Sequence, residues 1–162
     1  MHALSEGQYP ASARWKRKST VLGFALGSAG IERCQTGFML SVGTVVMGVE
    51  IFDRAVGFWT AALDYRPKRE IGPDDDFIIL VPKSGSGTHL ALDVSESPVQ
   101  AHPRVHLDLY ADDEADQAAQ VGRLIALGAT TVDWDLYPAN PDFVVLADPE
   151  GNRFCVIDTG HG

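Results

Sequence analysis

Hydrophobic and polar positions follow one pattern twice along this chain. In residues 142–158, two apolar runs flank residues 148–152, Asp-Pro-Glu-Gly-Asn, a cluster of turn-forming residues. A proline there presets φ for a turn and Gly151 can adopt positive φ, so the pattern predicts strand, tight turn, strand. Residues 76–92 have the same layout at an offset of 66 residues, which places Gly85 opposite Gly151. The repetition predicts a chain built from two similar modules.

A helix is predicted ahead of each hairpin. Asp53 can cap the first helix, which we expect to end near Asp64, and the apolar stripe predicted to face a sheet comprises Ala55, Phe58, Trp59, Ala62 and Leu63. Trp59 is interpreted as a core residue of that stripe. Asp112 or Asp113 begins the second helix and Gly128 ends it as a C′ glycine, with an apolar side of Ala118, Val121, Leu124 and Ile125.

Extended segments complete a βαβββ order in both copies. The first module is expected to have strands at 40–49, 66–71, 77–81 and 88–93, and the second at 104–110, 130–134 and in the two arms of the hairpin at 142–158. Turn or loop residues are expected at 72–75 and 137–141, and a proline-containing linker at 95–103. The predicted modules therefore span about 40–93 and 104–159.

Composition limits the classes of function. The 162 residues are 45% hydrophobic, enough for one domain or two fused modules to bury a core, and no run of about 18 apolar residues indicates a membrane span. A net charge of −9 argues against a nucleic-acid partner, which needs a basic surface. Two cysteines, Cys34 and Cys155, do not make a disulfide framework, so a reducing, cytoplasmic location is expected.

The N-terminal stretch differs from the rest of the chain. Residues 1–38 carry five basic and two acidic side chains and no sustained period, which predicts a poorly ordered extension ahead of a domain at 39–162. Two alternatives stay open. One is a secretory signal with a basic start at 14–18 and an apolar stretch at 21–26, and the other is a translated upstream region whose natural start is Met39.

With this duplicated order, residues 40–159 resemble the vicinal oxygen chelate superfamily, which includes glyoxalase I, bleomycin-resistance proteins, fosfomycin-resistance enzymes and extradiol dioxygenases. The glyoxalase-like domains are the nearest in pattern, and the segments that carry the resemblance are 52–59, 104–109, 127–130 and 148–156. The resemblance implies an α+β fold in which two tandem βαβββ modules form a cupped, incomplete barrel with the helices outside. It also implies a homodimer.

The resemblance further implies a ligand set. In metal-using members the first and last strands of each module each point one ligand into the cup, and here those positions are Thr44, His89, His106 and Cys155. Threonine stands where histidine is common, and cysteine where glutamate is common. Two imidazoles and a thiolate suit Zn²⁺. His89, His106 and Cys155 are therefore the predicted ligands of a divalent metal such as zinc.

Strand alternation supports the same face independently. If Leu90 and Leu92 and their equivalents in the second module pack beneath the helices, then His89, His106 and Cys155 face the cup. Asp108 lies on that face as well, and its spacing from His106 suits a proton-transfer pair. The alternative interpretation of Cys155 is a small buried hydrophobic residue.

Three functions remain open from the sequence. The first is an enzyme, a metal-assisted lyase, isomerase or dioxygenase, in which a metal or the pair His106 and Asp108 acts on a small substrate with adjacent oxygens. The second is a metal-free binding and sequestration protein of the bleomycin-resistance type, whose acidic, aromatic-lined cup holds a cationic or aromatic compound. The candidate ligand-binding residues are Thr44, Tyr110, Trp134 and Tyr137. The third is a folded remnant or partner domain without a ligand.

Overall fold

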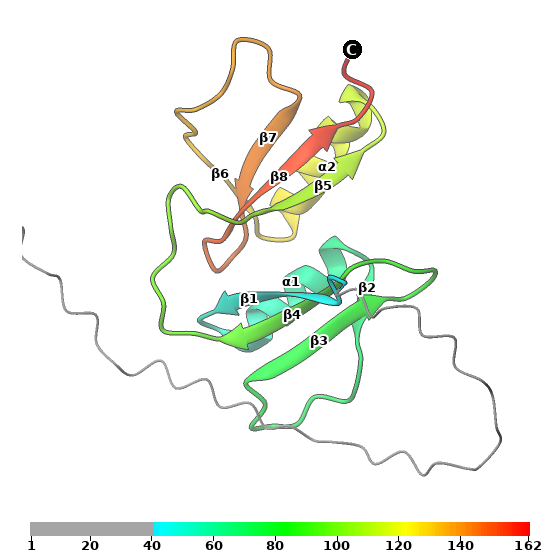
Figure 1. Cartoon of the computed structure of the whole chain (residues 1–162), viewed down its shortest axis with the longest axis vertical. Coiled ribbons are helices and arrows are strands. Elements are labelled where there is room, and N and C mark those ends of the chain that lie inside the picture. The colour runs from blue at the N-terminus through cyan, green and yellow to red at the C-terminus, as the bar shows by residue number, and fades with distance from the viewer. Residues whose placement is uncertain (1–40) are drawn as a thin grey trace, which may run out of the picture. The chain divides into compact units, whose positions relative to one another are not determined.

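The computed structural model describes residues 41–162, which contain two copies of one βαβββ order (Figure 1). The first copy comprises β1 (Thr44–Val49), α1 (Phe52–Ala62), β2 (Tyr65–Pro67), β3 (Phe77–Pro82) and β4 (His89–Val94). The second comprises β5 (Leu107–Ala111), α2 (Glu114–Ala126), β6 (Thr130–Thr131), β7 (Phe143–Ala147) and β8 (Arg153–Asp158). The predictions for residues 1–38 lie outside the described residues.

Each copy forms its own four-stranded sheet. The strand orders are β1-β4-β3-β2 and β5-β8-β7-β6, and in both sheets the first strand runs parallel to the last while the other pairs are antiparallel. The register pairs Thr44 with His89 in the first sheet and Asp108 with Cys155 in the second. The predicted α+β fold of two tandem modules with open sheets is confirmed.

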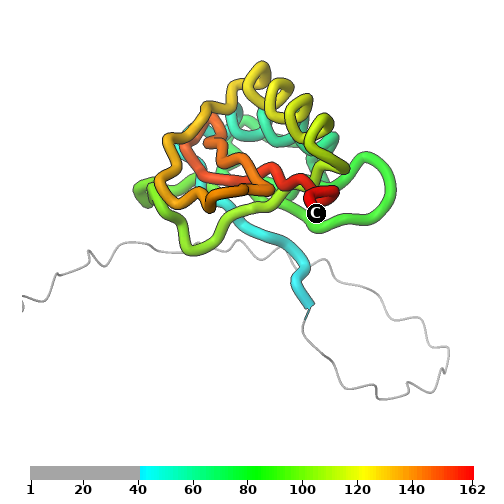
Figure 2. Tube along the Cα trace, turned by 90° about the horizontal axis from the view of Figure 1, so that it is seen from above, coloured from blue at the N-terminus to red at the C-terminus, as the bar shows by residue number. Residues whose placement is uncertain are grey.

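Aromatic side chains from both modules form one core. Trp59 on α1 is fully buried, and its ring lies 5.1 Å from Phe58 and 5.4 Å from Phe154, both in edge-to-face contact. Phe58 also lies 6.2 Å from Phe154 of β8. Since Phe58 and Trp59 belong to the first module and Phe154 to the second, the modules share their hydrophobic interior. In Figure 2, α2 (yellow) lies over β8 (red), against which it packs.

The prediction that Asp53 caps α1 is wrong. The residue before the helix is Ile51, which makes no side-chain cap, and Asp53 lies inside the first turn. The missing cap comes from the β7–β8 turn of the other module. Glu150 accepts hydrogen bonds from the backbone N–H of Glu50 at 2.9 Å and of Ile51 at 2.8 Å, and from Arg54 Nε at 2.6 Å. A carboxylate at a helix N-terminus satisfies free N–H groups and complements the helix dipole.

The second module also caps the other end of α1. Two nitrogens of the Arg123 guanidinium donate to the carbonyls of Ala61 at 3.2 Å and Ala62 at 2.9 Å. Trp59 Nε1 in turn donates to the buried Asp148 carboxylate at 3.0 Å. An anion at the N-terminus and a cation at the C-terminus both favour the helix electrostatically. The helix of the first module is thus completed by side chains of the second.

Helix α2 is capped locally, as predicted. Asp113 accepts from the N–H of Asp116 at 2.8 Å, and Gly128 adopts φ of +114° just after the helix. The predicted apolar side is too wide, because Leu124 is buried and Val121 partly buried while Ile125 is 41% exposed.

Four predicted strands also differ from the structure. The strand expected over 40–49 begins at Thr44, and the strand expected over 66–71 is Tyr65–Pro67. The strand expected from residue 104 begins at Leu107, and the strand expected over 130–134 covers only Thr130–Thr131. The chain between β6 and β7 is instead a loop beside the second sheet. Within residues 41–162, α1 has 11 residues and α2 has 13, and neither helix can cross a membrane.

Candidate functional site

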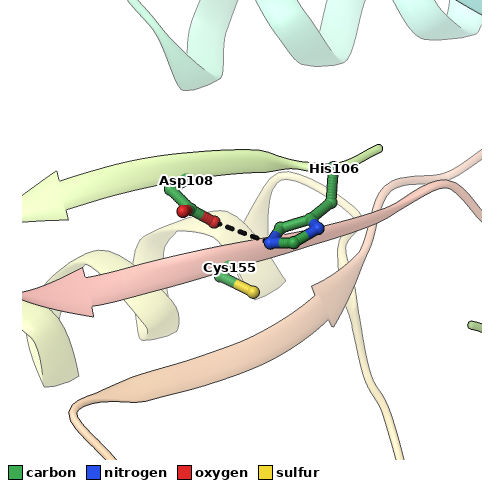
Figure 3. Close-up of side chains that lie close together, drawn as sticks. All are labelled: His106, Asp108 and Cys155. Carbon is green, nitrogen blue, oxygen red and sulfur yellow. Dashed lines mark ion pairs between the residues drawn. The ribbon is translucent and has the colours of Figure 1, made fainter. Parts of the chain in front are cut away.

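Three chemically active side chains meet on the second sheet. His106 directly precedes β5, Asp108 lies on β5, and Cys155 lies opposite Asp108 on the parallel neighbour β8. Figure 3 shows the three side chains projecting from the same region of these strands, with an ion pair joining His106 to Asp108. His106 Nε2 lies 3.1 Å from Asp108 Oδ1, and the candidate ligand atoms of all three residues lie within 4.8 Å of one another. We call this group the His106–Asp108–Cys155 cluster.

Strand alternation explains why these residues face the same way. Phe154 and Val156 point into the core shared with the helices, so the residue between them points to the opposite face. The same alternation holds on β5, where Leu107 and Leu109 pack against the core and Asp108 does not. The predicted facing of Asp108 and Cys155 is therefore confirmed for the second module.

The thiol of the cluster stays protonated at neutral pH. Burial raises the pKa of Cys155 to about 11, and the charge of Asp108 and a hydrogen bond to its carboxylate add to the effect. The neutral thiol is the donor in that bond, so Asp108 accepts from Cys155 and pairs with His106. Without a metal, the cluster is therefore the Asp108 carboxylate with an imidazole and a neutral thiol as its partners, and Cys155 is not an activated nucleophile.

A pocket of about 360 Å³ lies over the cluster. Its polar lining consists of His106, Asp108, Arg153 and Cys155. Its apolar lining consists of Pro103, Trp134, Leu136, Phe143, Val145 and Ile157, with part of Phe154. All of these residues belong to the second module or to the end of the linker before it. The size and the few polar groups in an apolar wall are typical of small-molecule sites.

Two of the predicted ligand-binding residues lie in or beside the wall of this pocket. Trp134 lines it, and its ring lies 4.9 Å from that of His102, whose Nε2 is 2.8 Å from Asp135 Oδ1. Tyr137 does not line the pocket but contacts two residues that do, because its hydroxyl oxygen accepts from the N–H of Val145 at 2.8 Å and its ring lies 5.2 Å from Phe143.

The other two predicted residues lie elsewhere. Tyr110 is 76% exposed and lines a separate cavity of about 330 Å³ that also contacts Leu63 and Arg123. Thr44 lies on β1 beside His89 of β4, in the first sheet. Within residues 41–162, the candidate metal group contains Asp108 in addition to His106 and Cys155, and His89 is not a member. The geometry thus brings together two of the three predicted metal ligands and adds a carboxylate.

Sequence reasoning missed Arg153. It begins β8, two residues before Cys155 and on the same face, and it lines the pocket. Its Nη1 donates to the carbonyl of Gly151 at 3.3 Å, while its Nε is the one buried side-chain nitrogen or oxygen of residues 41–162 without a hydrogen-bond partner. The alternation that places Cys155 on this face places Arg153 there as well, but it does not indicate that the guanidinium lines a pocket.

Comparisons with known proteins agree on the fold. A family model described as a glyoxalase-like domain matches residues 44–157. No curated protein matches the sequence. Among solved structures, a glyoxalase-related enzyme from Fulvimarina pelagi is 17% identical with a TM-score of 0.55, and the alignment covers 74% of this chain and 88% of that one.

Two further structures have similar scores. A glyoxalase/bleomycin resistance protein/dioxygenase family enzyme from Burkholderia phytofirmans is 16% identical with a TM-score of 0.55, covering 72% of this chain and 97% of that one. The fosfomycin resistance protein FosX from Listeria monocytogenes is 10% identical with a TM-score of 0.57, covering 74% and 91%. A FosX variant has been solved with Mn(II) and 1S,2S-dihydroxypropylphosphonic acid. At identities this low, the structural similarity shows that the proteins share a fold, and it shows nothing about their activities.

Proposed function

We propose that this chain, which belongs to the glyoxalase-like domain family, binds a small organic molecule in the pocket over the His106–Asp108–Cys155 cluster. The observation that carries the proposal is the coincidence of the cluster with a pocket of about 360 Å³ whose wall is otherwise apolar. Apolar walls supply binding free energy and a few polar groups fix the orientation of the ligand. The pocket is lined by the second module and the linker end, so the first module contributes stability rather than contacts to the ligand.

Within this pocket, His106 is the residue suited to move a proton. Its Nε2 lies 3.1 Å from Asp108 Oδ1. In the tautomer in which the Nε2–H group donates a hydrogen bond to this carboxylate, Nδ1 carries no proton and is the basic nitrogen. An imidazole oriented by a carboxylate is a common general base. Cys155 donates to the same carboxylate through its neutral thiol and is not a nucleophile at neutral pH.

The donor set also fits a metal ion, and this favours the enzyme alternative over simple sequestration. One imidazole, one carboxylate and one thiol within 4.8 Å of one another are the ligand types of three-residue zinc sites. Bound there, zinc would supply Lewis acidity toward a substrate oxygen. Because the pKa of Cys155 is about 11, zinc must displace the thiol proton, and its affinity should fall steeply as the pH decreases.

Metal analysis separates the two alternatives. The full chain would be purified from zinc-supplemented medium and its metal content measured for the wild type, His106→Ala, Asp108→Ala and, as the matched control, His89→Ala. We expect stoichiometric zinc in the wild type and His89→Ala and its loss in the other two. Zinc that disappears in His89→Ala would restore the ligand set predicted from the sequence. Absence of metal from every preparation would leave the metal-free binding protein as the function.

The predicted homodimer is a separate proposal. Size-exclusion chromatography with light scattering would test it, and a mass equal to the 17.5 kDa of one chain would refute it.

A further inference from the structure

We infer that the ligand of this pocket is an organic anion with an apolar body, and that Arg153 determines this specificity by binding its carboxylate or phosphonate group. The inference rests on the proposed function, because it concerns the same pocket. It is carried by Arg153, the one arginine or lysine of the pocket wall, which takes part in no ion pair of residues 41–162.

The charged side chains of the pocket differ in the partners that they have within the protein. Asp108 is paired with His106 at 3.1 Å and accepts the hydrogen bond of Cys155. Arg153 takes part in none of the ion pairs of residues 41–162. Its single hydrogen bond is a long one of 3.3 Å to a backbone carbonyl, and its Nε is buried without an acceptor. Arg153 is therefore the hydrogen-bond donor of this pocket that lacks an anionic partner among the described residues.

An unpaired guanidinium donor is costly unless an acceptor completes it. Buried polar groups nearly always have partners, and a donor without one loses its hydration free energy. Arginine presents its donors as a planar fork that matches the two oxygens of a carboxylate or phosphonate. An anionic ligand would supply acceptors to the guanidinium where it lines the pocket, whereas a cationic ligand would be repelled by it.

The position of Arg153 also sets where the rest of the ligand lies. Arg153 and Cys155 are two residues apart on one face of β8, so an anion held by the guanidinium lies beside the His106–Asp108–Cys155 cluster. The apolar body then meets the apolar part of the wall, which includes Trp134 and Phe143. The net charge of −9 for the whole chain suggested a cationic compound, but the Arg153 guanidinium without an ion-pair partner in the pocket wall favours an anion.

The test uses compounds of one shape and different charge. Phenylacetate, phenylacetamide and 2-phenylethylammonium share an aromatic ring and a short arm, and benzylphosphonate carries a phosphonate in place of the carboxylate on the same frame. Dissociation constants would be measured by amide chemical-shift titration of the full chain, followed at Val145 and Ile157 in the pocket wall. The variants are Arg153→Met, which keeps an apolar stem, Arg153→Lys, which keeps the charge without the fork, and Arg66→Met, an exposed arginine outside the pocket, as the control.

We expect the wild type and Arg66→Met to bind phenylacetate at least about tenfold more tightly than phenylacetamide, as charge-assisted hydrogen bonds require. The preference should disappear in Arg153→Met and be partly kept in Arg153→Lys. Benzylphosphonate that binds more tightly than phenylacetate would identify a phosphonate-like ligand, and the reverse order a carboxylate, both in accord with the inference.

Other results would overturn it in distinguishable ways. Equal binding of phenylacetate and phenylacetamide, unchanged in Arg153→Met, would refute the role of Arg153 and leave the pocket intact. Tighter binding of 2-phenylethylammonium than of phenylacetate would show that the pocket selects cations, which contradicts the inference. Absence of shifts with all four compounds would refute the pocket itself and the proposed function with it. Thermal unfolding of each variant checks the fold, and Arg153→Met should unfold no earlier than the wild type, because it removes an unpaired buried donor.

Discussion

Removal of the Glu150 carboxylate tests whether the second module completes the helix of the first. The side chain of Glu150 is 1% exposed and accepts from two backbone N–H groups at the start of α1 and from Arg54 Nε. In Glu150→Ala these donors lose their acceptor. Glu150→Gln keeps the shape of the side chain but loses its charge. It also places an NH2 donor where the neighbouring N–H groups need an acceptor.

The expected magnitude follows from these contacts. A backbone N–H left without a partner costs about 1–3 kcal/mol when buried, but Ile51 is 48% exposed, so water replaces part of each bond. The ion pair adds little, since the Arg54 side chain is 44% exposed and solvent screens its charge. We expect Glu150→Ala to lower the free energy of unfolding by about 2–3 kcal/mol, equivalent to about 8–12 °C in Tm for a domain of this size. Glu150→Gln should cost about 1–2 kcal/mol.

The assay is urea unfolding of the full chain, followed by circular dichroism and tryptophan fluorescence, with coincident transitions as the check on two-state behaviour. Asp53→Asn is the matched control. It removes an acidic group from the same first turn of α1 without removing a cap, so only the helix-dipole interaction of about 0.3–1 kcal/mol is lost. Costs within about 0.5 kcal/mol of each other for Asp53→Asn and Glu150→Ala would refute the capping role.

The pH dependence gives a second readout. Burial alone would raise the pKa of Glu150, but the hydrogen bonds from Arg54 and from the backbone of Ile51 and Glu50 outweigh it and hold the pKa below its usual value of 4.5. A carboxyl with a lowered folded pKa stabilises the fold above its unfolded pKa and loses this contribution as the pH falls through the folded pKa. The stability difference between the wild type and Glu150→Gln should be constant above about pH 5.5 and shrink below 4.5. A constant difference down to pH 3 would contradict the assignment.

Three further predictions follow from the contacts. Trp59→Phe should lower the free energy of unfolding by about 1–3 kcal/mol in the same urea assay, because the buried Asp148 carboxylate loses one of its hydrogen-bond donors and a small cavity opens. Arg123→Met should cost about 0.5–1.5 kcal/mol, since the last carbonyls of α1 lose a cation but remain open to water. In a Cys34→Ser background, Cys155 should react with iodoacetamide about 100-fold more slowly at pH 8 than a thiol of pKa 9.0, with a rate that rises about tenfold per pH unit to pH 10. Asp108→Asn should accelerate this reaction, and a rate already constant by pH 9 would contradict the raised pKa of the thiol.

Features set by local chemistry could be predicted from the sequence. Gly85, Gly128 and Gly151 all adopt positive φ, at +72°, +114° and +88°, where the turn and helix-end patterns place them. Alternation along β8 correctly placed Cys155 away from the core, because its neighbours Phe154 and Val156 are both buried. These predictions hold since each depends on residues within a few positions of one another.

Features set by contacts between distant segments could not be predicted. The cap of α1 is 99 residues away from Ile51 in the chain, and no local pattern indicates that an acidic turn residue has that partner. The predicted metal set combined His89 with residues of the other sheet, which requires knowledge of how β4 lies relative to β8. Alternation fixes the face of a strand on which a side chain lies, and it does not fix which sheets share a pocket.

The two modules share an order of elements but not a role. At the offset of 66 residues, Glu150 corresponds to Ser84 and Asp148 to Pro82, so the first hairpin lacks the carboxylates with which the second binds the neighbouring helix. In register, the pair Asp108 and Cys155 corresponds to Thr44 and His89, which lie outside the cluster. The β7–β8 hairpin therefore carries both the cross-module cap in its turn and, within a few residues, the polar wall of the pocket on β8. A variant of this turn that lowers ligand binding can therefore act through the cap of α1 or through the pocket wall. Comparison with Arg153→Met, which leaves the cap intact, distinguishes the two causes.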